Sequence, residues 1–171
     1  METHIVIMAG GIGSRFWPMS TPECPKQFID VTGCGKSLIQ LTVERFQGLC
    51  IPDNIWIVTS EKYKETVRKQ LPSVPPHHIL TEPVARNTAP CITYACWKIK
   101  KHHPHANIVV TPADALVINT DEFRRAIAKA LRDDRSKQGH CNHRYQTLPP
   151  GNGIRIYSRR RRGGSGYTES G

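Results

Sequence analysis

Apolar residues along the chain follow two different patterns. Short, continuous apolar runs rich in β-branched residues are typical of buried strands, and they occur at His4–Ala9, Asn54–Thr59, Ile79–Leu80 and Ala106–Thr111. Helical spacing of apolar residues, or a charged stretch ended by proline, predicts helices over Lys36–Phe46, Glu61–Leu71, Thr88–Lys101 and Asp121–Leu131. Thr120 precedes the last of these helices and is expected to be its N-cap.

This alternation of strands and helices predicts a doubly wound α/β fold with a mostly parallel, Rossmann-like sheet. Ligands of such sheets bind outside the carboxyl ends of the strands, where candidate motifs occur here. With 171 residues, of which 38% are hydrophobic, the chain is long enough for one domain with a core. No stretch approaches the roughly 20 apolar residues that span a bilayer, and no signal sequence precedes the first strand, so we expect a cytoplasmic protein without a membrane partner.

A glycine-rich loop follows the first predicted strand. Residues 8–20 read MAGGIGSRFWPMS, and PKQF follows at residues 25–28. Glycines let the backbone approach a ligand closely and direct successive N–H groups at phosphate oxygens. Arg15 and Lys26 add charge that can compensate a polyphosphate. The segment therefore predicts an anion-binding loop.

Glycine alone does not establish this function, because a tight strand-to-helix turn needs glycine for steric reasons whatever it binds. The loop is neither a Walker A motif, since no Gly-Lys-Ser/Thr closes it, nor a GxGxxG dinucleotide motif. Its order of glycine loop, Arg, Pro and Pro-Lys resembles the signature of the sugar-1-phosphate nucleotidyltransferases. The resemblance implies that a nucleoside triphosphate is held by Gly10, Gly11, Gly13, Ser14, Arg15 and Lys26.

The segment after the third predicted strand reads TEPVARNTAPCI at residues 81–92. Its polar side chains could read a base edge, or Asn87 or Thr88 could simply cap the next helix. The string E-P-x-x-R-N-T-A-P resembles the segment that separates mannose-1-phosphate guanylyltransferases from relatives that transfer thymidylyl, uridylyl or adenylyl groups. By that resemblance Glu82, Arg86 and Asn87 lie near the guanine and ribose of GTP.

Asp114 follows the fourth predicted strand, in NIVVTPADALV at residues 107–117. A carboxylate there could hold Mg²⁺ against phosphate oxygens, although a lone aspartate in a turn more often caps the turn. The family places its first metal aspartate in the same strand-Pro-x-Asp context, so the resemblance implies that Asp114 binds Mg²⁺. The next residue is often His in the family and is Ala115 here, which departs from the pattern at a neighbouring phosphate or sugar contact.

The resemblance implies transfer of GMP from GTP to mannose 1-phosphate, which gives GDP-mannose and pyrophosphate. A sugar-phosphate oxygen would attack the α-phosphorus in line with departing pyrophosphate, and no covalent enzyme intermediate is needed. Catalysis would then consist of positioning and charge neutralisation by Arg15, Lys26 and Mg²⁺ on Asp114. GTP and mannose 1-phosphate are the expected partners, and self-association into a homo-oligomer is left open.

The formal net charge of +10 is unevenly distributed. Residues 1–135 carry 17 basic and 13 acidic residues, a net of +4, whereas residues 136–171 carry 7 basic and 1 acidic, a net of +6. The second segment has few apolar residues and no periodicity, and it contains an Arg159–Arg162 run and a Gly/Ser end. The resemblance also ends near Arg135. We therefore predict a nucleotidyltransferase domain at 1–135 followed by a disordered basic tail at 136–171.

A shifted reading frame would explain this tail. Read one nucleotide out of register, the degenerate codons of Lys137–Ser158 can encode SKAIVTIGIKPYPPETGYGYI, which resembles the family's own continuation toward the sugar phosphate. Sequencing the gene tests the hypothesis, because codons unable to spell that peptide would refute it. On this interpretation the sheet is incomplete at its C-terminal side, and the sugar-binding half and a second metal carboxylate are missing. We then expect weak GTP binding and little transferase activity.

Parts of the sequence could also serve other classes of function. A nucleic-acid-binding protein would use Arg159–Arg162 as phosphate contacts, but the run lacks interleaved aromatic residues, so no specific nucleic acid is expected. A non-catalytic nucleotide-binding or regulatory subunit could pair with a longer transferase through exposed edge strands. Several histidines lack an acidic or cysteine partner at fixed spacing and are expected to be solvated rather than to bind metal: His77, His78, His102, His103 and His105.

Overall fold

The computed structural model describes residues 2–11, 16–82, 88–136 and 155–157. Along the chain its strands and α-helices are β1 (Thr3–Met8), α1 (Leu38–Glu44), β2 (Ile55–Ser60), α2 (Lys64–Gln70), β3 (Ile79–Glu82), α3 (Thr88–His102), β4 (Asn107–Pro112), α4 (Thr120–Ser136) and β5 (Arg155–Tyr157). Short 3-10 helices include η2 (Lys26–Phe28), η4 (Glu61–Tyr63) and η5 (Pro76–His78). Every strand and helix that the apolar pattern predicts is present.

The strands form one sheet in the order β3-β2-β1-β4-β5. β1 pairs in parallel with both β2 and β4, and β3 pairs in parallel with β2, whereas β5 is antiparallel to β4. The strand order reverses between β1 and β4, which is the topological switch point where ligands bind in such sheets. The prediction of a doubly wound, mostly parallel sheet is confirmed.

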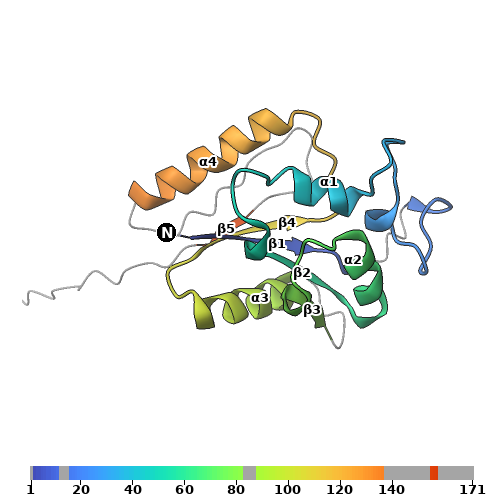
Figure 1. The fold of residues 1–171 in the computed structure, drawn as a ribbon, viewed down its shortest axis with the longest axis horizontal. Coiled ribbons are helices and arrows are strands. Elements are labelled where there is room, and N and C mark those ends of the chain that lie inside the picture. The colour runs from blue at the N-terminus through green and yellow to red at the C-terminus, as the bar shows by residue number, and fades with distance from the viewer. Residues whose placement is uncertain (1, 12–15, 83–87, 137–154, 158–171) are drawn as a thin grey trace, which may run out of the picture.

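Helices cover both faces of the sheet, with α1 and α4 on one side and α3 on the other (Figure 1). Ile5 and Ile7 of β1 pack on the first side in a core that includes Phe46 and Ile127, and α2 contributes to the same core. Val6 packs on the second side with residues of α3. Because both faces are covered, the strands are apolar at consecutive positions rather than at alternate ones. Each buried isoleucine contributes roughly 1.5–3 kcal/mol to folding.

The N-cap of α4 differs from the prediction. Asn119, not Thr120, caps the helix, because Asn119 Oδ1 accepts the backbone N–H of Glu122 at 3.0 Å. Its backbone oxygen also accepts the N–H of Phe123 at 3.1 Å. Thr120 is the first residue of the helix, and asparagine is at least as strong an N-cap as threonine.

Arg155–Tyr157, which lie within the predicted tail, form β5. This strand pairs with Ile108, Val109 and Val110 of β4 and covers an edge that would otherwise present unpaired backbone groups. Residues 137–154 and 158–171, which include the Arg159–Arg162 run and most of the segment assigned to a shifted frame, lie outside the described residues. None of the described helices is long and apolar enough to cross a membrane.

Candidate functional site

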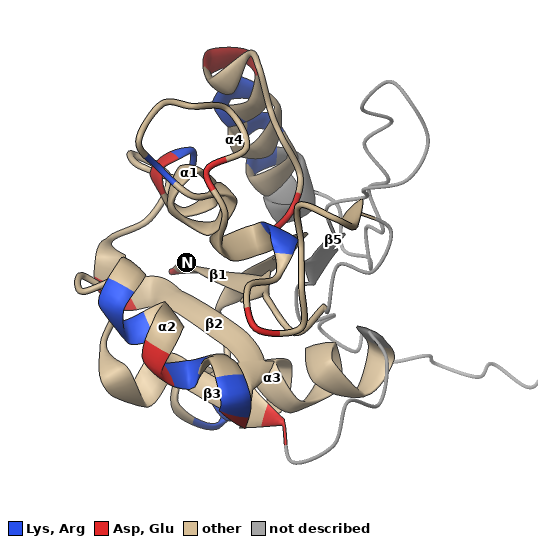
Figure 2. Cartoon of the chain, turned by 90° about the vertical axis from the view of Figure 1, so that its right-hand side faces the viewer, with Lys and Arg blue, Asp and Glu red and all other residues tan. Residues whose placement is uncertain are grey.

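The glycine loop leaves the carboxyl end of β1 beside β2, at the edge of the sheet that faces the viewer in Figure 2. The Ala9 N–H donates to the carbonyl of Val58 at 2.7 Å, so the parallel pairing continues up to the loop. Neither Gly10 nor Gly11 has φ in the left-handed region that favours glycine. A Cβ atom on Gly11 would meet no atom of the described residues within 4 Å, so contacts with those residues do not explain this glycine.

Gln27 holds this loop from η2, and no sequence motif identified it. Its side chain is only 3% exposed, and Nε2 donates to the carbonyl of Ala9 at 3.1 Å and to that of Gly11 at 2.8 Å. Thr59 at the end of β2 donates its hydroxyl to the same Ala9 carbonyl at 3.0 Å. These bonds fix the start of the loop relative to β2 and η2.

Lys26 precedes Gln27 in η2 and is half-buried. Its Nζ atom lies 4.9 Å from the centroid of the Phe16 ring, so the cation is held near the chain just beyond the loop. The remaining predicted phosphate and base contacts cannot be placed, because they lie outside the described residues: Gly13, Ser14, Arg15, Arg86 and Asn87.

Glu82 and Asp114 lie at the same edge of the sheet as the loop. Glu82 is the last residue of β3, and its Oε2 lies 3.9 Å from the position that a Cβ on Gly10 would occupy. Burial raises the pKa of this carboxyl. Asp114 is half-buried just beyond β4, where the Ala113 N–H donates to the carbonyl of Met8 at 3.0 Å. The structure thus brings four of the predicted site residues to the carboxyl ends of β1, β3 and β4: Gly10, Gly11, Glu82 and Asp114.

This edge fits a magnesium ion better than a transition metal. The candidate ligands there are carboxylate oxygens, which are hard ligands of the kind Mg²⁺ prefers. Mg²⁺ is usually held by one or two carboxylates together with substrate phosphates and water, rather than by a complete cage of protein ligands. Of the residues that the structure describes at this edge, Asp114 is the carboxylate that could hold the ion, and the remaining positions are left to a nucleotide and water.

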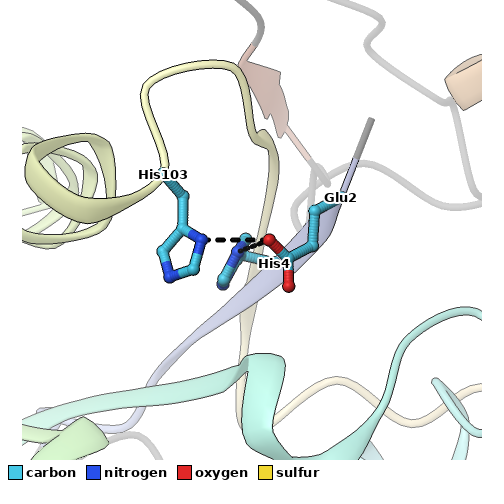
Figure 3. A group of neighbouring side chains, drawn as sticks. All are labelled: Glu2, His4 and His103. Atoms are coloured by element: carbon cyan, nitrogen blue, oxygen red, sulfur yellow. Dashed lines mark ion pairs between the residues drawn. The ribbon is translucent and has the colours of Figure 1, made fainter.

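A second group of potential metal ligands lies at the opposite edge of the sheet, where Glu2, His4 and His103 meet (Figure 3). Glu2 Oε2 is 2.9 Å from Nδ1 of His103 and 3.6 Å from Nε2 of His4. The expectation of solvated histidines without an acidic partner is therefore wrong for His103. It is also wrong for His78, which is buried and stacks on Trp56 at 3.7 Å between ring centroids.

Hydrogen bonding argues against a metal at this second group. The indole Nε1–H of Trp56 donates to Nδ1 of His4 at 3.1 Å, and an indole nitrogen can only donate. Nδ1 of His4 therefore carries the lone pair, and burial lowers the pKa of this imidazole, which favours its neutral form. The single ring proton is then on Nε2, which lies 3.6 Å from Glu2 Oε2. A protonated Nε2 cannot ligate a metal, so we interpret the group as a cluster of polar contacts rather than a metal site.

Comparisons with known proteins agree with the fold and the motifs. A family model described as nucleotidyl transferase matches residues 4–156, past the expected end of the resemblance near Arg135 and into β5. The mannose-1-phosphate guanylyltransferase of Klebsiella pneumoniae is 37% identical over 137 residues, which are 79% of this chain and 28% of that protein. The enzyme of the same name from Escherichia coli is 36% identical over 137 residues, with the same shares.

A solved structure supports the same relationship. The crystal structure named as mannose-1-phosphate geranyltransferase from Thermus thermophilus superimposes with a TM-score of 0.70 at 29% identity, and it covers 78% of this chain and 38% of that one. The chain spans only about 28% of the length of the curated relatives that it matches. Because the family model matches most of its length, the chain belongs to the nucleotidyl transferase family.

Proposed function

We propose that this chain is the nucleotide-binding part of a mannose-1-phosphate guanylyltransferase, which transfers GMP from GTP to mannose 1-phosphate. The observation that supports the proposal best is the position of the glycine loop, Glu82 and Asp114 on one side of the sheet, at the carboxyl ends of β1, β3 and β4. The names of the most similar relatives agree with this reaction. So does the segment at residues 81–92, which resembles the one typical of guanylyltransferases.

In the proposed reaction an oxygen of mannose 1-phosphate forms a bond to the α-phosphorus of GTP. The bond from that phosphorus to the oxygen bridging to the β-phosphorus breaks, and pyrophosphate leaves with the electron pair. The backbone of the glycine loop, including Gly13 and Ser14, would orient the triphosphate, while Arg15 and Lys26 neutralise its charge. Mg²⁺ held by Asp114 would supply further positive charge beside the phosphates.

Base selection is assigned to the segment after β3. Glu82 would accept hydrogen bonds from the guanine or ribose, and Arg86 and Asn87 would supply further contacts. A half-buried carboxylate is suited to this task, because a base that leaves it unpaired would lose a hydrogen bond and leave a partly desolvated polar group without a partner. We expect GTP to bind more tightly than ATP for this reason.

The sugar-binding half of the site is proposed to lie outside the matched residues, in agreement with the 28% of the relatives' length that the chain spans. The alternative candidate is a non-catalytic nucleotide-binding subunit. We further propose that residues 136–171 are largely a product of a shifted frame, and that the protein acts in the cytoplasm. Weak GTP binding with little transfer is the expected behaviour of the chain.

Thermal unfolding of the purified chain with GTP and Mg²⁺ tests the proposal, with ATP as the comparison. A ligand that binds only the folded state stabilises it by about 2.7 kcal/mol at 100 times its Kd. We expect a larger rise with GTP than with ATP, and a reduced Mg²⁺ effect in Asp114→Asn. Equal responses to both nucleotides, or none, would contradict the proposal. Release of pyrophosphate in the presence of mannose 1-phosphate would separate a transferase from a non-catalytic subunit.

A further inference from the structure

We infer that Thr42 and Arg45 of α1 are positioning residues that orient Asp114, an inference that rests on the proposed metal role of that carboxylate. Asp114 lies in the turn between β4 and α4, flanked by Ala113 and Ala115. The Thr42 hydroxyl shares its one proton between the carbonyl of Leu38, one helical turn earlier, at 2.8 Å and the carbonyl of Ala113 at 3.2 Å. Nη2 of Arg45 donates to the carbonyl of Ala115 at 2.6 Å and to the Thr42 hydroxyl oxygen. The two carbonyls that bracket Asp114 are therefore both held by α1.

Both side chains are deeply buried. Thr42 is 0% exposed and Arg45 is 3% exposed. Burying a guanidinium is costly unless it is hydrogen-bonded or paired, and no carboxylate of the described residues lies within ion-pair distance of Arg45. Burial lowers the pKa of Arg45 to about 10, while the charge of Asp114 opposes that decrease. Arg45 therefore remains charged at neutral pH and places its charge beside the turn that carries Asp114.

The end of α1 is itself fixed to α4. Nε of Arg124 donates to the carbonyl of Arg45 at 3.0 Å, and its Nη2 donates to the carbonyl of Glu44 at 3.0 Å. The Arg45 guanidinium also lies 5.6 Å from the centroid of the Phe123 ring. Helix α1, the Asp114 turn and the start of α4 thus form one connected unit. Neither Thr42 nor Arg45 needs to touch a ligand in order to set the direction of the Asp114 carboxylate.

Outer partners that orient metal ligands typically contribute 10–100-fold to metal affinity. The measurement is therefore a Mg²⁺ titration at a fixed, saturating concentration of GTP, followed by the thermal unfolding of the full chain. Thr42→Val and Arg45→Met should raise the Mg²⁺ concentration at the midpoint of the stabilisation by about tenfold or more. Arg45→Lys keeps a charged donor and should raise the midpoint less.

A purely structural role predicts a different result. Loss of stability alone would lower the unfolding temperature at every Mg²⁺ concentration and leave the midpoint unchanged. Thr93→Val is the matched control, because the Thr93 hydroxyl also donates to a carbonyl one helical turn earlier, that of Ala89 at 2.9 Å, but on the exposed surface of α3. If Arg45→Met does not fold, Thr42→Val carries the test.

Asp114→Asn separates failure of the inference from failure of the proposed function. If Asp114→Asn raises the Mg²⁺ midpoint and Thr42→Val and Arg45→Met do not, the positioning role is wrong and the proposed function stands. If Asp114→Asn itself leaves the midpoint unchanged, the metal role of Asp114 is wrong and the inference falls with it. A rise in all three variants, with none in Thr93→Val, supports both.

Discussion

Replacing Gly11 by alanine should separate ligand binding from folding stability. Glycine is often kept in a turn because no other residue adopts its backbone conformation, but Gly11 has no left-handed φ. A Cβ at this position would have no neighbour within 4 Å among the residues that the structure describes. We therefore expect the free energy of unfolding of Gly11→Ala to be unchanged or higher by up to about 1 kcal/mol, because alanine reduces the conformational entropy of the unfolded chain.

The affinity of Gly11→Ala for GTP should be lower than that of the parent chain. If the triphosphate passes close to the backbone at Gly11, the added methyl group occupies part of the space that the phosphates need. A tenfold loss of GTP affinity, equivalent to about 1.4 kcal/mol, is the smallest effect we expect from such an overlap. Urea denaturation measures the stability of the variant, and calorimetric titration with GTP and Mg²⁺ measures the affinity.

Gly33→Ala is the matched control. Gly33 has φ +71°, and its N–H donates to Asp30 Oδ1 at 2.7 Å in the exposed loop between η2 and α1. Alanine in this left-handed conformation should cost about 1–2 kcal/mol of stability and leave GTP affinity unchanged. The reasoning is refuted if Gly11→Ala loses stability as Gly33→Ala does, or if it binds GTP as tightly as the parent chain.

Two further changes follow from buried polar groups. Gln27→Leu should lower the free energy of unfolding by about 1–3 kcal/mol, measured by urea denaturation, because the Gly11 carbonyl loses its donor. The same change should weaken GTP binding. An unchanged GTP affinity would argue against a role of Gln27 in shaping the loop. Acidification from pH 6.5 to 4 should remove up to about 3 kcal/mol, because burial lowers the pKa of His78 from 6.5 to about 4 and the unfolded chain binds the proton first. His4, whose pKa burial also lowers, acts in the same direction. Urea midpoints across this range should depend less on pH in His78→Gln, and a flat profile of the parent chain would contradict the assignment.

The sequence was sufficient for the four parallel strands, β1 to β4, because they obey a simple rule. Strands of a parallel sheet covered on both faces are apolar at consecutive positions, as Ile5, Val6 and Ile7 are, and such runs stand out from the amphipathic helices between them. The side of the sheet on which the site lies also follows from topology, because the carboxyl ends of parallel strands all lie on one side. The positions of Gly10, Glu82 and Asp114 directly after predicted strands are therefore enough to expect them at one edge.

Other features leave no periodic trace in the sequence. Gln27 meets the carbonyl of Gly11 across 16 residues, and Arg45 meets that of Ala115 across 70. Such bonds between a side chain and a distant backbone group depend on how elements pack, which neither spacing nor composition records. His78 follows two prolines, and the sequence predicts that it is solvated. In the structure it is the last residue of η5, and its ring stacks on that of Trp56. A search for acidic partners at fixed spacing likewise misses Glu2, because it reaches His103 only through the fold.

The contacts described here that support the proposed nucleotide site lie within residues 2–136. Backbone hydrogen bonds connect the carboxyl ends of β1, β2 and β4. Gln27 in η2 holds the glycine loop, and α1, which is itself bound to α4, holds the turn of Asp114. None of these contacts depends on the larger part of the relatives that this chain does not match. The described half of the site should therefore keep its geometry without the proposed sugar-binding half. This arrangement predicts that the chain binds GTP without transferring GMP to mannose 1-phosphate. A chain that unfolds cooperatively but does not bind GTP would show that the proposed nucleotide site needs the part of the relatives that this chain does not match.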